Sequence, residues 1–313
     1  MRTALFTALL PLLAIATWSC RGLQRHADLL VGSMPAPAGT SVRVTYLGCN
    51  GFLITSGGTA LLVDPCFTRP GLLAVGLNRP IPADVARIES GLDRGGVPED
   101  VDAILVTHAH YDHLLDVPHI RGERGGVILA SPTGCFTARA HGVAEDDVDP
   151  VLPGAERRVG DASVRVIESA HDRVLCRVPF PGEYREVPET PPARAREYLC
   201  GQPLAYLIEL GGRKIYVDSG GRPEVLPPVV PGGIDLALIG AALPDSRARF
   251  VRAVERLQPR LVYPTHQDNF FRPVDKPYRF NFGTNFPALR REFEAADTGA
   301  EMILFDFFQC LEL

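Results

Sequence analysis

Four side chains of types that bind metal ions lie within six consecutive positions. His108, His110, Asp112 and His113 belong to the run His-Ala-His-Tyr-Asp-His at residues 108–113. Neutral imidazole and carboxylate are usual ligands of zinc, and a catalytic site keeps one coordination position for water. His108 and His110 are two positions apart, so both side chains point to one side of an extended segment. The run therefore predicts a metal-binding loop, in which Asp112 and His113 follow a bend and can serve a second ion.

The rest of the chain offers no competing site of this specificity. It has eight histidines in total, so a chance cluster of three around a carboxylate is improbable. His26, His119 and His141 lie outside this cluster, and we interpret them as surface residues or as core residues whose hydrogen bonds are satisfied. The sequence contains no Ser-His-Asp elbow, P-loop or dinucleotide fingerprint. Metal chemistry is therefore the predicted activity.

The elements that must position this loop alternate between strands and helices. The apolar strand predicted at residues 102–107 ends where the histidine run begins, and ligand sites commonly lie at the carboxyl ends of strands in α/β folds. Two similar halves follow one another, which predicts an α/β sandwich of two sheets flanked by helices. The expected strands are residues 42–47, 52–55, 60–65, 102–107, 127–131, 163–167, 204–210, 213–217, 234–239, 260–263 and 301–307, and the expected helices are 83–92, 133–141, 246–257 and 287–296.

These motifs, in this order, resemble those of the metallo-β-lactamase superfamily. The resemblance rests on the histidine run, on residues 46–54 and 61–65, and on His171, Asp218 and His266. It implies the αβ/βα sandwich of two mixed sheets that characterises this superfamily. It also implies two divalent metal ions, with zinc preferred, and a hydroxide held between them as the nucleophile.

The resemblance implies a role for each ligand. Asp112 is expected to be catalytic as well as a ligand, because it can orient the hydroxide and receive its proton. The implied ligand sets are His108, His110 and His171 for the first metal, Asp112, His113 and His266 for the second, and Asp218 as the carboxylate that bridges them.

Two further positions bear on the site. Asp64 is either an outer-shell carboxylate that fixes a histidine ring or simply a turn residue before Pro65. After Leu47-Gly48 the resemblance leads us to expect histidine, but this chain has Cys49, so the resemblance implies no substrate contact at this position.

The implied activity is hydrolysis. Asp218 disfavours a β-lactamase, since members that open β-lactams generally lack this bridging carboxylate. The sequence resembles most the branch of L-ascorbate-6-phosphate lactonase and N-acylphosphatidylethanolamine-hydrolysing phospholipase D. We therefore predict a dinuclear hydrolase of a phosphodiester or phospholipid-like substrate. The alternatives are a lactonase or other ester hydrolase and a non-catalytic metal-binding envelope protein.

Composition limits the partners. The chain has 313 residues, of which 46% are hydrophobic and 22% charged, as in an ordinary globular protein. Its 32 basic and 37 acidic side chains give a net charge of −5, and no basic run could neutralise a phosphate backbone. A small-molecule or lipid-like substrate is therefore expected, and nucleic acid is not.

The N-terminal residues predict export. Arg2 and the apolar stretch at residues 4–17 resemble a secretory signal over residues 1–20. Cys20 lies where a bacterial lipoprotein carries its lipid, so the chain is expected in the cell envelope, anchored through Cys20 or released by cleavage nearby. Residues 21–40 are predicted to be a linker, and residues 41–313 the hydrolase domain.

An insert at residues 173–203 is rich in proline and without hydrophobic period. Because it follows His171 directly, we expect it to form a gate beside the metals. Its cysteines, Cys176 and Cys200, are predicted to pair. The aromatic residues Phe180, Tyr184 and Tyr198 could form an apolar wall, and Arg173, Arg177, Arg185, Arg194 and Arg196 could meet a phosphate.

Overall fold

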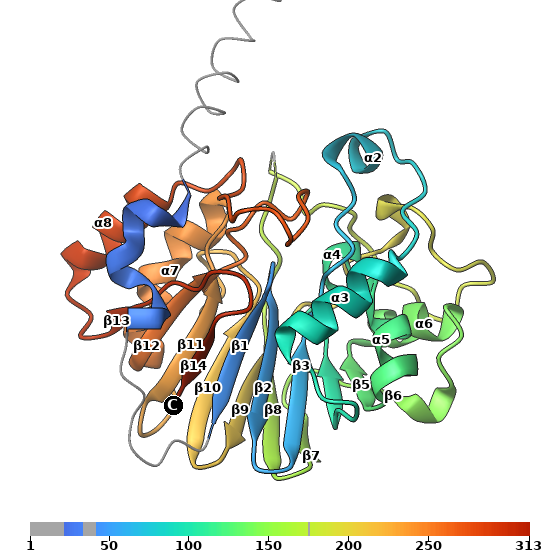
Figure 1. Cartoon of the computed structure of the whole chain (residues 1–313), viewed down its shortest axis with the longest axis horizontal. Coiled ribbons are helices and arrows are strands. Elements are labelled where there is room, and N and C mark those ends of the chain that lie inside the picture. Colours follow the sequence, from blue (N-terminus) through green and yellow to red (C-terminus); the bar gives the residue numbers. More distant parts are fainter. Residues whose placement is uncertain (1–21, 34–41, 175) are drawn as a thin grey trace, which may run out of the picture.

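Two seven-stranded mixed sheets pack face to face between two layers of helices, which confirms the predicted fold class (Figure 1). The computed structural model describes residues 22–33, 42–174 and 176–313. From edge to edge the first sheet contains β14 (Cys310–Glu312), β1 (Arg43–Gly48), β2 (Gly51–Ser56), β3 (Thr59–Val63), β4 (Ala103–Leu105), β5 (Val127–Ala130) and β6 (Val148–Pro150). The second contains β13 (Glu301–Met302), β12 (Pro259–Thr265), β11 (Ile234–Gly240), β10 (Arg213–Asp218), β9 (Leu204–Leu210), β8 (Ala162–Glu168) and β7 (Glu156–Val159).

The helices divide between the outer faces of the two sheets (Figure 1). Apolar side chains of α3 and α5 join the cluster on the outer face of the first sheet, whereas α7 packs on β11 and β12 of the second. The helices are α2 (Leu72–Gly76), α3 (Val85–Gly95), α4 (Tyr111–Leu114), α5 (Val117–Arg124), α6 (Pro132–Ala140), α7 (Pro244–Leu257) and α8 (Phe286–Ala296), with 3-10 turns η1 (Leu23–Leu29), η2 (Val31–Ser33), η3 (Glu145–Asp147) and η4 (Ala195–Glu197).

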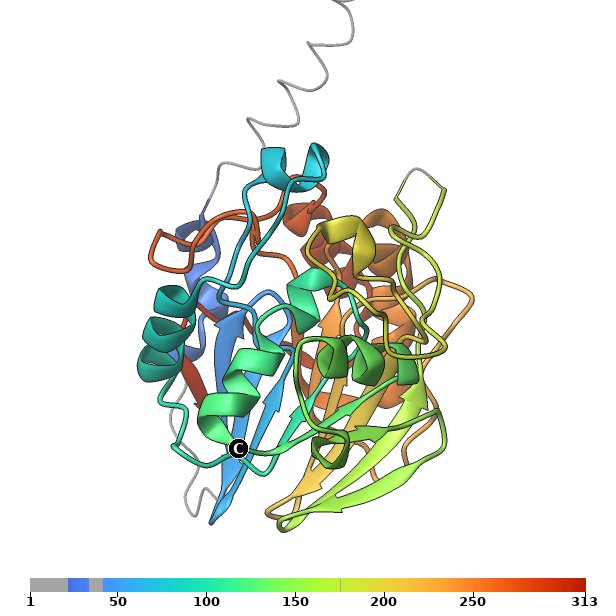
Figure 2. The same ribbon diagram turned by 90° about the vertical axis from the view of Figure 1, so that its right-hand side faces the viewer.

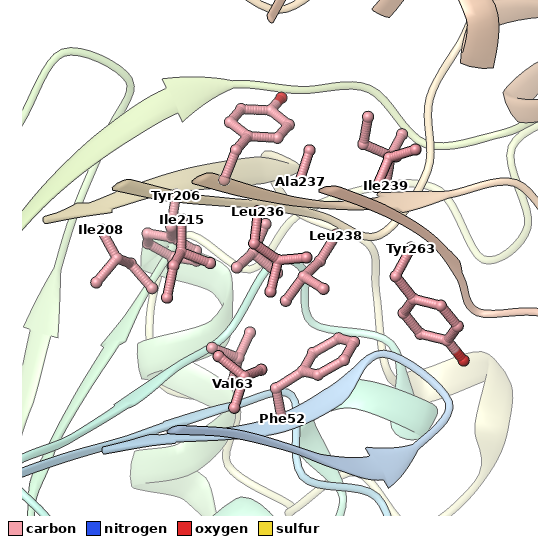
Figure 3. Packing of buried hydrophobic residues seen from close by; sticks show 14 of the residues in the cluster. Phe52, Val63, Tyr206, Ile208, Ile215, Leu236, Ala237, Leu238, Ile239 and Tyr263 are labelled. Atoms are coloured by element: carbon pink, nitrogen blue, oxygen red, sulfur yellow. The ribbon is translucent and has the colours of Figure 1, made fainter. Parts of the chain in front are cut away.

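The main core fills the space between the sheets. Figure 3 shows Phe52 and Val63 of the first sheet facing side chains of the second, among them Leu236 and Tyr263. The interior strand β11 is almost continuously apolar because it pairs in parallel on both sides and is covered on both faces. The sheets are therefore held by apolar burial rather than by the polar groups at their ends.

The C-terminal strand is where the sequence prediction was wrong. One strand was expected at residues 301–307, but pairing ends at Met302 in the second sheet and resumes at Cys310 in the first. Between these points the chain crosses from one sheet to the other. Its apolar side chains are therefore buried between the sheets, but they do not belong to one strand. Leu304, for example, bridges to Leu30.

Residues 22–33, inside the segment predicted to be a linker, pack against the domain. Leu23 and Val31 are buried, and the Val31 amide donates to the Leu304 carbonyl at 3.0 Å. Residues 1–20 and Cys20, to which export and anchoring were assigned, lie outside the described residues. Among the helices that are described, none combines the length and apolar character that a bilayer crossing requires.

Leu236→Ala should lower the free energy of unfolding by about 2–5 kcal/mol, because it leaves a cavity between the two sheets. Urea unfolding measures this loss. Leu73→Ala is the matched control, since Leu73 is 76% exposed and Leu236 is fully buried; the control should stay within about 0.5 kcal/mol of the parent. Equal effects of the two substitutions would contradict the assigned core.

Candidate metal centre

The predicted ligands gather at one end of the sandwich, where strands of both sheets finish. The run at residues 108–113 follows β4, His171 follows β8, and His266 follows β12 directly. His110 is still extended, with φ −66° and ψ 156°, and the single turn α4 begins at the next residue. The bend expected within the run is thus a change from extended chain to helix, and it sends His108 and His110 to one group and Asp112 and His113 to another.

The first group contains His108, His110 and His171. One ring nitrogen of each lies within 4.8 Å of the others. His108 Nε2 is 3.0 Å from His110 Nδ1, and the His171 ring centroid is 4.7 Å from that of His108. The other nitrogen of His171, Nδ1, lies 2.7 Å from the Asp172 carbonyl oxygen and donates to it, which leaves Nε2 for the group.

The second group contains Asp112, His113 and His266, and Cys49 joins them. The Nε2 atoms of His113 and His266 are 3.1 Å apart. Asp112 Oδ2 lies 3.6 Å from the former nitrogen and 3.4 Å from the latter. The rings of His108 and His113 are 4.0 Å apart between centroids, so the two groups are immediate neighbours.

The protonation states of these groups suit cation binding. Burial lowers the pKa of His110 to about 3 and that of His171 to about 4, and burial with the neighbouring imidazoles holds the pKa of His108 well below its usual value. Burial opposes ionisation of Asp112, but the adjacent His113 and His266 lower its pKa below the ordinary value. At neutral pH the first group therefore offers neutral imidazoles, whereas in the second group burial opposes protonation of His266 but the Asp112 carboxylate outweighs it and raises the pKa of this imidazole. Imidazole and carboxylate are the donors that a divalent metal ion requires.

Asp64 contacts a ligand, so the structure favours its outer-shell interpretation over a simple turn. Its Oδ2 lies 2.8 Å from Nδ1 of His113 and accepts from the Thr107 hydroxyl at 2.5 Å, while its Oδ1 accepts from the Thr107 amide at 2.7 Å. A carboxylate on Nδ1 fixes the tautomer and leaves Nε2 free to bind a metal.

Asp218 is the predicted ligand that the structure does not bring to either group. Its carboxylate is fully buried and accepts from Arg249 at 2.7 Å, Tyr216 at 2.9 Å and Ser169 at 2.8 Å. The negative charge of Asp218 is thus neutralised by Arg249 rather than shared with the histidines. The next residue, Ser219, instead lies near the first group, with its Oγ 3.4 Å from His108 Nδ1. The bridging role of Asp218 therefore stays a prediction.

Two side chains at the site, one thiol and one carboxylate, were not predicted from the sequence to be functional. Cys49 was noted only as a departure from histidine, and Asp172 was not singled out. Asp172 lines the cavity described below, and a Cβ built on Gly220 would lie 2.4 Å from its Oδ2. Burial raises its pKa to about 6. The position of Asp172 directly after the predicted ligand His171 is the feature of the sequence that could have indicated it.

A cavity of about 330 Å³ opens onto both groups. Phe180 of the insert lies edge-on to His110, with ring centroids 5.7 Å apart, and Phe270 lies edge-on to His266 at 5.3 Å. Other apolar walls come from α2 and the loops that follow β11 and β12. Its lining includes Val75, Val174, Leu243, Phe271 and Phe282.

The insert reaches the cavity through fewer residues than predicted. Figure 2 shows it at the same end of the sandwich as α2. Phe180 lines the cavity, but the hydroxyl groups of Tyr184 and Tyr198 contact Glu197 and His141 instead. The disulfide predicted between Cys176 and Cys200 is absent, since both are free thiols, the first exposed and the second buried.

The comparisons with known proteins agree with this architecture. The sequence model described as Metallo-beta-lactamase superfamily matches residues 44–182. A metal-dependent hydrolase of Thermus thermophilus is 28% identical over 234 residues, 73% of this chain and 85% of that protein. The 4-amino-L-phenylalanyl-(peptidyl-carrier-protein) 3-hydroxylase of Streptomyces venezuelae is 26% identical over 277 residues, 84% of this chain but 44% of that protein. A metallo hydrolase of Ignicoccus hospitalis has the same fold, with a TM-score of 0.56 at 15% identity over 88% of this chain and 99% of that one.

The fold, the family model over residues 44–182 and the sequence relatives together show that the chain is similar to proteins of the metallo-β-lactamase superfamily and has their fold. The relatives include metal-dependent hydrolases, and the chain has two adjacent groups of side chains that could hold metal ions. The closer resemblance to the lactonase and phospholipase D branch stays a prediction.

Asp218→Asn should lower the free energy of unfolding by about 3–5 kcal/mol, because it leaves the Arg249 guanidinium buried without its anionic partner. Metal content should not change. Asp235→Asn is the control, since Asp235 pairs with Arg213 near the surface and should lose less than about 1 kcal/mol. Urea unfolding and elemental analysis give the two readouts. Loss of one metal ion without loss of stability would return Asp218 to the bridging role.

Asp64→Asn should weaken zinc binding about 10–100-fold, because the amide cannot hold the His113 ring as the carboxylate does. Competition with a chromogenic chelator measures the affinity. Asp102→Asn serves as the control, since Asp102 accepts from the Ala60 amide and contacts no ligand in the described part of the chain. Zinc affinity within twofold of the parent in Asp64→Asn would contradict the role given to this carboxylate.

Proposed function

We propose that this chain is a hydrolase that holds two divalent metal ions, zinc preferred, and cleaves an uncharged carboxylic ester or lactone that carries an apolar group. The observation that carries the substrate class is the character of the cavity over the metal-binding side chains. Within the described residues, no lysine or arginine lines it. Phenyl rings and aliphatic side chains form its walls, so an apolar acyl or alkyl chain gains burial there.

The arginines of the insert support this choice over the phosphodiester expected from the sequence. Arg173 is bound by Asp245 through two hydrogen bonds, and Arg194 donates to the Asn78 carbonyl. Arg185 pairs with Glu183, and Arg177 and Arg196 are exposed. A phosphate is normally held by charge-assisted hydrogen bonds from such side chains. Hydrolysis of a phosphodiester is therefore the second candidate function. In that case the metal ions alone would supply the positive charge that binds the phosphate.

The proposed chemistry divides between the ions and the chain. When bound, the two ions supply a water of lowered pKa and neutralise negative charge that develops on the carbonyl oxygen. Asp112, whose pKa lies below its usual value, stays ionised and accepts the proton of the attacking water at its carboxylate. Phe180 and Phe270 hold the apolar part of the substrate and exclude bulk water from the groups beside them.

The test compares p-nitrophenyl esters and γ-lactones of increasing chain length with bis(p-nitrophenyl) phosphate, using protein whose zinc, iron and manganese contents are measured. We expect kcat/KM to rise with chain length for esters or lactones and to exceed that for the phosphodiester. Phe180→Ala should lower kcat/KM about 10-fold or more for the long-chain substrate, because an apolar contact is lost, and change it little for the acetyl ester.

Asp112→Asn and removal of metal by a chelator should each abolish turnover. Preferred cleavage of the phosphodiester would replace the ester proposal by the second candidate. Two bound ions without turnover of any substrate class would favour the non-catalytic metal-binding protein. Absence of bound metal in metal-replete medium would refute the two-ion site itself.

A further inference from the structure

The thiol of Cys49 points into the second group of ligands. Cys49 lies in the turn between β1 and β2 and is fully buried. Its Sγ is 3.5 Å from Nε2 of His266, and the four ligand atoms of Cys49, Asp112, His113 and His266 all lie within 4.8 Å of one another. The thiol therefore belongs to the same cluster as the three expected ligands.

The separations within this cluster are those of ligand atoms around one ion. Zinc binds nitrogen at about 2.0–2.1 Å and sulfur at about 2.3 Å, so tetrahedral geometry places two nitrogens about 3.3 Å apart and a nitrogen and a sulfur about 3.5 Å apart. The observed values are 3.1 Å between His113 and His266 and 3.5 Å between Cys49 and His266. Because Sγ is also 4.0 Å from Nδ1 of His266 and the thiol donates to the Asp112 carbonyl at 3.7 Å, the sulfur lies beside the imidazole ring, at the distance of a fourth ligand from Nε2.

The backbone holds the thiol there at a conformational cost. Cys49 and His266 both have left-handed φ angles, 57° and 61°, which non-glycine residues adopt only when surrounding contacts enforce them. The Cys49 carbonyl accepts from the His266 amide and the Thr265 hydroxyl, each at 3.1 Å. Its amide donates to Asp268 at 2.9 Å, and Asp268 is held in turn by Arg69. Cys49 and His266 are therefore positioned as a pair.

The charge of the site provides an independent argument. Asp218 is neutralised by Arg249, so Asp112 is the one carboxylate in the two groups of metal-binding side chains. Six ligands with a single negative charge would leave two divalent ions poorly compensated in a buried site. A thiolate at Cys49 adds the second negative charge next to the ion that needs it.

We propose that Cys49 is a metal ligand whose thiolate completes a Cys-Asp-His-His coordination sphere in the second group. The proposal rests on the proposed two-ion site. Binding releases the thiol proton to solvent, as it does whenever cysteine ligates a metal. Because four protein ligands close a tetrahedral site, the position open to water then lies in the three-histidine group.

Cobalt substitution of the full chain tests the assignment without reference to activity. With two Co²⁺ bound, the wild-type protein should show the near-ultraviolet charge-transfer absorption of a cobalt thiolate, and Cys49→Ser should lose it completely. Cys135→Ser is the matched control: Cys135 is also buried, but its thiol donates to the Ala130 carbonyl and it is outside the ligand group. This variant should keep the band.

X-ray absorption on the wild-type zinc protein gives a second readout that needs no variant and so survives a folding defect in Cys49→Ser. One sulfur at about 2.3 Å for every two zinc ions is expected. Two bound ions with only nitrogen and oxygen neighbours would overturn the Cys49 ligand and leave the proposed function standing. A cobalt band that survives in Cys49→Ser would also overturn it. Failure of the chain to bind metal would overturn both.

Discussion

One buried carboxylate, that of Asp64, connects the segments that build the metal centre. It follows β3, receives two hydrogen bonds from Thr107 after β4, accepts from Asn50 in the turn after β1, and contacts Nδ1 of His113. Three loops are thus fixed to one another through a single side chain before any metal arrives. Because satisfied buried polar networks are rigid, the imidazole of His113 is presented in one orientation and the neighbouring ligands can be placed relative to it.

Much of this arrangement could be predicted from the sequence because its determinants are local. Apolar periodicity located β9 at residues 204–210 and most other strands within one or two residues, since burial on a sheet fixes the alternation of side chains. The run at residues 108–113 predicted its own bend, because an extended histidine pair followed by a carboxylate cannot serve one ion from one face. His171 and His266 required the family resemblance, since neither has a local signal.

The remaining features depend on contacts between residues far apart in the chain. Asp218 has the residue type of a bridging ligand, but Arg249, 31 residues later, neutralises it, and no pattern around Asp218 reveals that partner. Cys49 joins a ligand group only because residue 266 is brought beside it. The arginines of the insert were expected at the cavity from their proximity to His171. Ion pairs with Asp245 of α7 and with Glu224 after β10 instead hold Arg173 elsewhere.

The walls of the cavity come from segments that support neither sheet. Phe180 belongs to the insert between β8 and β9, and Phe270 to the loop between β12 and α8, and in their described parts neither loop adds a strand to the sandwich. The ligands, by contrast, are rooted at strand ends or on α4. Substitutions at Phe180 and Phe270 can therefore accumulate without disturbing the metal-binding frame, whereas Asp268 of the second loop holds the Cys49 amide and belongs to that frame. This separation gives evolution, or directed evolution in the laboratory, a way to exchange one substrate for another while the catalytic apparatus is inherited unchanged.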